Sequence, residues 1–100
     1  MATQITFEKI GGDMVSATPI DDWNTPTLQL FITKANTKNK AFITIKAAVK
    51  DDADDSYAVV YSAQCSTGTY VFKVNNTTDG VNYKIVCENC SAAEGYYLND

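Results

Sequence analysis

Three cysteines are the first candidates for a metal or redox site in this chain. Cys87 and Cys90 are separated by two residues, as in many zinc sites and thiol redox pairs, and Cys65 lies farther upstream. A structural zinc site needs four ligands, so a carboxylate such as Glu88 or Glu94 would have to complete it. Redox pairs with this spacing accompany a βαβ pattern, whereas this pair ends an expected strand. We therefore expect buried thiols or one strand-to-strand disulfide, with metal binding as the lesser alternative.

An acidic run, Asp-Asp-Ala-Asp-Asp at residues 51–55, is the second candidate for a metal site. Clustered carboxylates can bind calcium, but the EF-hand loop needs alternate ligands, a central glycine and a late glutamate, and that pattern does not follow here. Like charges between two strands are more typical of a solvated turn, which also discourages edge pairing. We expect a solvated turn, and calcium binding is the alternative.

The composition weighs against catalysis and against nucleic-acid binding. The chain has 100 residues and a net charge of −4, with eight lysines, no arginine and no histidine. Histidine is the most frequent general base, so a serine or cysteine nucleophile would lack its usual partner. Arginine is the side chain that binds phosphate in a bidentate way, and nucleic-acid-binding domains are usually basic. We expect a non-enzymatic protein that uses no cofactor and binds no nucleic acid.

The sequence shows neither the pattern of a secretory signal nor that of a membrane-spanning segment. Residues 1–10 alternate apolar and polar and lack the basic start and apolar stretch of a secretory signal. The longest apolar runs, such as residues 58–61, are far shorter than the roughly 20 residues that span a membrane. We expect neither an export signal nor a membrane partner.

Three lysines are the charged candidates for contact with another protein. Lys34, Lys38 and Lys40 surround a short polar segment. Such a cluster could contact an acidic partner surface. Lysines are also common at soluble loop tips, and this is the simpler interpretation.

Three aromatic residues are the apolar candidates for such contact. Trp23, Tyr96 and Tyr97 fall outside the clear apolar–polar alternation, whereas most other aromatic residues occupy the inward positions of expected strands. Aromatic side chains are enriched at protein interfaces. We therefore expect these three to be exposed.

The elements that must position these residues are strands, because the dominant hydrophobic period is two. Residues 27–34 and 41–50 alternate apolar and polar side chains, which is typical of half-buried strands. The polar residues 35–39 between them predict a hairpin. Residues 70–74 and 81–87 alternate in the same way around a turn at 75–80, which predicts a second hairpin.

Further strands are expected along the rest of the chain. Residues 3–9 predict one strand, and residues 56–64 predict a central strand because Val59 and Val60 make it apolar on both faces. Residues 14–18 and 96–98 are weaker candidates. Residues 18–26, which contain both prolines and the only tryptophan, predict an ordered crossing loop.

The pattern predicts one all-β domain over residues 1–100. Six to eight strands and no helix favour a single antiparallel β-sandwich, Ig-like or jelly-roll-like. A small closed barrel is the alternative.

Residues 1–10 form a short alternating strand, and residues 27–48 give an apolar strand (28–32), an asparagine-containing turn (36–39) and a β-branched strand (42–45). This arrangement resembles the small β-sandwich decoration, or cement, proteins of tailed bacteriophage heads. The resemblance covers about half of the chain.

The resemblance implies a virion structural protein with no enzymatic activity. Such a protein binds the major capsid protein from outside, often as a dimer or trimer, and is made in the host cytoplasm before it joins the capsid surface. The alternative is a carbohydrate- or receptor-binding module of a viral tail or a cell surface, which would use exposed Trp23, Tyr96 and Tyr97.

Overall fold

Alternation of apolar and polar side chains produces strands throughout the described part of the chain. The computed structural model describes residues 1–49 and 56–100, and in these residues the chain forms nine strands. They are β1 (Thr3–Ile5), β2 (Phe7–Ile10), β3 (Asp13–Ser16), β4 (Thr27–Lys34), β5 (Ala41–Ala48), β6 (Ala58–Cys65), β7 (Gly68–Lys73), β8 (Asn82–Glu88) and β9 (Cys90–Leu98). The described residues contain no helix that is long and apolar enough to cross a membrane.

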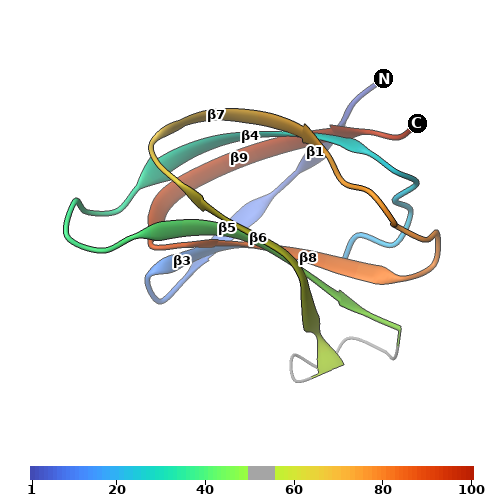
Figure 1. Cartoon of the computed structure of the whole chain (residues 1–100), viewed down its shortest axis with the longest axis horizontal. Coiled ribbons are helices and arrows are strands. Elements are labelled where there is room, and N and C mark those ends of the chain that lie inside the picture. The colour runs from blue at the N-terminus through green and yellow to red at the C-terminus, as the bar shows by residue number, and fades with distance from the viewer. Residues whose placement is uncertain (50–55) are drawn as a thin grey trace.

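The strands form two antiparallel sheets that face each other (Figure 1). One sheet has the order β1-β9-β4-β7, and the other has the order β2-β3-β8-β5-β6. The predicted antiparallel β-sandwich is confirmed. The strand count exceeds the predicted six to eight because residues 3–9 form two strands, which separate at Thr6 and join different sheets.

Both predicted hairpins are wrong in their pairing, although their strands are present. β4 pairs with β7 and β9, whereas β5 pairs with β6 and β8 in the other sheet. β7 and β8 are likewise in different sheets. Alternation only requires that one face of a strand be buried, and a core between two sheets satisfies this whichever sheet receives the next strand. Residues 35–40 and 74–81 therefore cross between the sheets.

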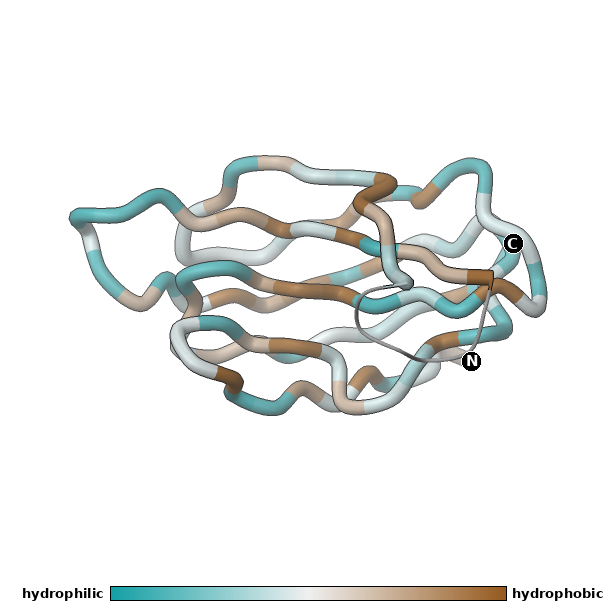
Figure 2. Tube along the Cα trace, turned by 90° about the horizontal axis from the view of Figure 1, so that it is seen from below, coloured by the Kyte–Doolittle hydropathy of each residue, from teal (hydrophilic) through white to brown (hydrophobic). Residues whose placement is uncertain are grey.

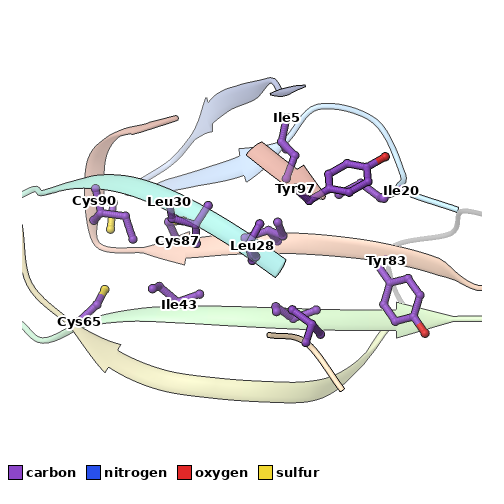
Figure 3. Packing of buried hydrophobic residues seen from close by; sticks show 14 of the residues in the cluster. Ile5, Ile20, Leu28, Leu30, Ile43, Cys65, Tyr83, Cys87, Cys90 and Tyr97 are labelled. Carbon is purple, nitrogen blue, oxygen red and sulfur yellow. The ribbon is translucent and has the colours of Figure 1, made fainter. Parts of the chain in front are cut away.

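The core lies between the two sheets and follows the predicted alternation. Leu28, Leu30 and Ile32 of β4 are buried, and they belong to one cluster with Ile43 of β5 and Ile85 of β8. Figure 3 shows Leu28 and Leu30 on one side of this core and Ile43 on the other. The polar residues of β4 point outward, so the outer faces of the sheets are the surfaces available to a partner.

The loop over residues 18–26 is an ordered crossing, as predicted. Ile20 and Tyr83 donate backbone hydrogen bonds to each other's carbonyl oxygens, with N···O distances of 2.9 and 2.7 Å. Trp23 and Pro26 are fully buried in the same loop. The loop therefore closes one end of the core while it takes the chain from β3 to β4.

Candidate interaction surface

Trp23 is a core residue, so its predicted exposure is wrong. Its side chain is 0% exposed, and its ring centroid lies 5.0 Å from that of Tyr83 and 5.9 Å from that of Tyr97. Trp23 lies in a loop, so strand alternation gave no indication of its burial. A large apolar side chain is nevertheless required there, because it closes the open end of the core between the two sheets. Trp23 therefore cannot contact a partner in this fold.

Tyr97 is also buried, contrary to its predicted exposure, whereas its neighbour Tyr96 is partly exposed. Tyr97 is 6% exposed, and its hydroxyl donates a hydrogen bond to Asp22 Oδ1 at 2.6 Å. Tyr96 points to the opposite face of β9, where its hydroxyl donates to Glu94 and its ring meets Phe31 edge to face at 6.3 Å. Successive strand residues point to opposite faces, so only one of two adjacent tyrosines can be accessible.

The buried Tyr97 hydroxyl predicts a loss of stability at alkaline pH. Burial, and then the hydrogen bond to Asp22, raise the pKa of Tyr97 to about 12. An unfolded tyrosine titrates near pH 10, so the folded state holds this proton more tightly between about pH 10 and 12. The stabilisation is complete below pH 10 and is lost as the pH rises toward 12.

We expect the free energy of unfolding to fall by up to about 1.4 kcal/mol per pH unit from this group in that window. Urea unfolding of the wild type and of Tyr97→Phe at a series of pH values measures the effect. The variant should be less stable at neutral pH, because it lacks the bond to Asp22, but its stability should fall less steeply above pH 10. Equal slopes would contradict this assignment.

The three lysines lie around one crossing between the sheets. Lys34 ends β4 and is half-buried, whereas Lys38 and Lys40 are exposed in the connection to β5. This connection projects from one end of the molecule and is hydrophilic (Figures 1 and 2). The structure places Lys38 and Lys40 together at one loop tip. Their exposure there is compatible with contact with a partner and also with solvation alone.

Asparagine side chains hold this lysine loop in place. Asn36 Oδ1 accepts hydrogen bonds from the backbone N–H groups of Lys38 and Asn39 at 3.1 and 3.0 Å. Asn89, which turns the chain from β8 to β9 with a φ of 55°, donates from Nδ2 to the Asn39 carbonyl oxygen at 3.0 Å. The lysines are therefore presented on an ordered loop that is anchored to the β8–β9 turn.

The strand predicted to be central over residues 56–64 is present as β6 over residues 58–65, and it is an edge strand. β6 is the last strand of its sheet, and Val59 and Val60 are each 57% exposed. The register shifts between Ile45 and Lys46 of β5, opposite Val60, so the alternation of β6 is broken at that point. The consecutive apolar residues Val59 and Val60 therefore belong to an irregular edge strand and not to a strand that is buried on both faces.

The outer face of the four-stranded sheet is the surface that the sequence analysis missed. Strand register places Gln29, Tyr96 and Val71 side by side on it, with Phe31 in the row on one side of them and Leu98 in the row on the other side. Phe31, Val71 and Leu98 are 39%, 60% and 50% exposed. We call these five residues the β4–β9 face. They come from three strands, so only the pairing of the strands brings them together.

The β4–β9 face carries little charge. Glu94 and Lys73 are the charged residues that the described strand register places beside it. The outer face of the five-stranded sheet differs, because Glu8, Lys46 and Lys84 lie on it. Protein interfaces are enriched in aromatic residues and poor in charge at their centre, so the β4–β9 face is the better candidate contact surface.

The cysteines are buried free thiols, which is one of the two states expected from the sequence. No metal centre is formed in residues 1–49 and 56–100. Cys65, Cys87 and Cys90 are all buried and unbonded. No group of three or more cysteine, aspartate or glutamate side chains in those residues is arranged to hold a metal ion. The acidic run at residues 51–55, the candidate for the calcium alternative, lies outside the described residues.

Comparison of the chain with protein-family models, with curated proteins and with solved structures gave no match. The class that the fold defines is a two-sheet antiparallel β-sandwich with one charge-poor outer face.

Proposed function

We propose that this chain is a non-enzymatic virion structural protein, a capsid decoration or cement protein that binds and stabilises the assembled head of a tailed bacteriophage. The resemblance of residues 1–10 and 27–48 to that class suggests the function. The observation that carries the proposal is the β4–β9 face, with exposed Phe31 and Val71 and few charges around them. The partner is the major capsid protein on the capsid surface, which the chain joins as a dimer or trimer.

The energetics of binding to an assembled capsid are compatible with a small β-sandwich that has one exposed apolar face. A protein that binds only the assembled lattice stabilises that state by mass action. Many copies on a repeating surface, or a linked dimer or trimer, gain strength from multivalency, so each contact can remain small. A net charge of −4 keeps a protein of this size soluble at high copy number.

Co-sedimentation of the purified chain with expanded phage heads that lack their own decoration protein tests the proposal. The wild type should sediment with the heads. Phe31→Lys together with Val71→Lys should weaken binding at least about tenfold, because charge is placed at the centre of the contact. Circular dichroism should show that this variant remains folded, because both side chains point outward.

The matched control places the same two charges on a different exposed apolar site. Val59→Lys together with Val60→Lys changes β6, whose side chains are exposed to a similar extent, and should leave binding unchanged. A wild type that never sediments with heads would overturn the function. Loss of binding in the β6 variant alone would overturn the choice of face.

A further inference from the structure

Three thiols are gathered near one end of the sandwich, beneath the lysine loop. Cys65 ends β6, Cys87 lies near the end of β8, and Cys90 begins β9. Their exposed fractions are 4%, 0% and 0%. Two of the three strands belong to the five-stranded sheet and β9 belongs to the other, so the cluster spans the gap between the sheets.

Cys65 and Cys90 are the two members of this cluster that face each other. Figure 3 shows their sulfur atoms turned toward one another across the gap between the sheets, and the Cys90 thiol donates a hydrogen bond to the carbonyl oxygen of Glu88 at 3.4 Å. Cys87 lies on β8 opposite Ile43 of the neighbouring strand β5, within the five-stranded sheet. The two thiols that face each other across the gap thus belong to β6 and β9, and not to the Cys87–Cys90 motif.

We propose that Cys65 and Cys90 are a site of disulfide formation, which joins the two sheets covalently. The oxidant is a low-molecular-weight disulfide such as oxidised glutathione. One cysteine thiolate attacks it, forms a mixed disulfide and releases one reduced glutathione. The second thiolate attacks the protein sulfur of that mixed disulfide and releases the other reduced glutathione. Two thiols lose their protons and are oxidised to one S–S bond, while one glutathione disulfide is reduced to two thiols.

The environment of the two thiols predicts which one reacts first and how the rate depends on pH. Burial raises the pKa of Cys90 to about 11. Burial also raises the pKa of Cys65, but the hydrogen bond with Cys90 and the positive charge of Lys34 oppose this rise. The thiolate is the attacking form, so oxidation is slow at neutral pH and faster at about pH 9. Cys65 is the first nucleophile, because it is 4% exposed and Cys90 is 0% exposed.

The cross-link would connect parts of the fold that are distant in sequence. It joins the edge strand β6 to β9, which lies inside the other sheet between β1 and β4. The loop that it closes runs from residue 65 to residue 90. Closing a loop of this length restricts the unfolded chain and should raise Tm by about 10 °C or more.

The experiment uses the full chain, incubated with oxidised glutathione at about pH 9 and then digested for peptide mapping by mass spectrometry. The expected product has lost the mass of two hydrogen atoms and contains a peptide pair linked through Cys65 and Cys90. Cys87→Ala should give the same cross-link, whereas Cys65→Ala should give none. Tm of the oxidised wild type should exceed that of the reduced protein.

Three results would overturn the proposal: thiols that remain free, a bond that maps to Cys87 and Cys90, or glutathione adducts that never close to a protein disulfide. The mapping of the wild type decides between them even where Cys65→Ala fails to fold. The outcome is also separate from the proposed function, because it involves neither phage heads nor the β4–β9 face.

Discussion

Replacing Trp23 with alanine is expected to lower the free energy of unfolding by about 3–5 kcal/mol, the usual cost of deleting a buried tryptophan. The indole is fully buried between Tyr83 and Tyr97 at the end of the core. Alanine would leave a cavity there, and the crossing loop from Thr18 would lose its main apolar anchor. Chemical denaturation followed by circular dichroism measures the change.

Two further variants test whether the loss of stability comes from the buried volume of the indole. Trp23 Nε1 has no hydrogen-bond partner within the described part of the chain, so Trp23→Phe removes volume without breaking a described hydrogen bond and should cost much less than alanine. Tyr96→Ala removes a neighbouring aromatic side chain that points outward, and should cost less than about 1 kcal/mol. An effect of Tyr96→Ala as large as that of Trp23→Ala would contradict the assignment of Trp23 to the core.

Gly95 is the second position at which a small change should have a large effect. It is buried in β9, where Ile5 and Leu30 are its partners on the neighbouring strands. A Cβ atom at this position would lie 2.9 Å from Leu30 Cδ2 and 3.1 Å from Phe7 Cε1. The first contact is too short and the second is tight, and the fully buried Leu30 would have to shift against its core neighbours. We expect Gly95→Ala to destabilise the protein by about 2–3 kcal/mol.

Gly12 provides the matched control for this substitution. A Cβ atom there would meet nothing within 4 Å, and the backbone does not have a positive φ. Gly12→Ala should leave stability unchanged or raise it slightly, because alanine restricts the unfolded chain. Denaturation of the two variants side by side measures the difference. Equal stabilities would show that the sheets accommodate a methyl group at Gly95 without strain.

The strands could be predicted well, but the partners of each strand could not. Alternation located β4 at Thr27–Lys34 and gave the buried set of Leu28, Leu30 and Ile32. It also located the strands of both predicted hairpins, yet each pair was divided between the two sheets. Period-two alternation records only which side chains are buried. It contains no information about whether the next strand returns beside its predecessor or crosses the core.

The candidate site was predicted less well than the fold, for a related reason. Trp23 and Tyr97 were chosen because they fell outside the alternation, and both are buried. Phe31 was overlooked because it stands among the apolar residues of β4, although its side chain points outward. One clue was present in the sequence, since odd-numbered positions from 27 to 33 face solvent and Phe31 is the apolar member of that set.

The sequence by itself determined that this protein is built from strands, that thiols lie in its core, and that histidine and arginine chemistry is absent. These properties depend on residue types and on contacts between near neighbours in the chain. The tertiary structure decided which strands are neighbours, and with them the β4–β9 face and the approach of Cys65 to Cys90. Both features join strands far apart in sequence, and only the pairing and packing of the two sheets brings such strands together.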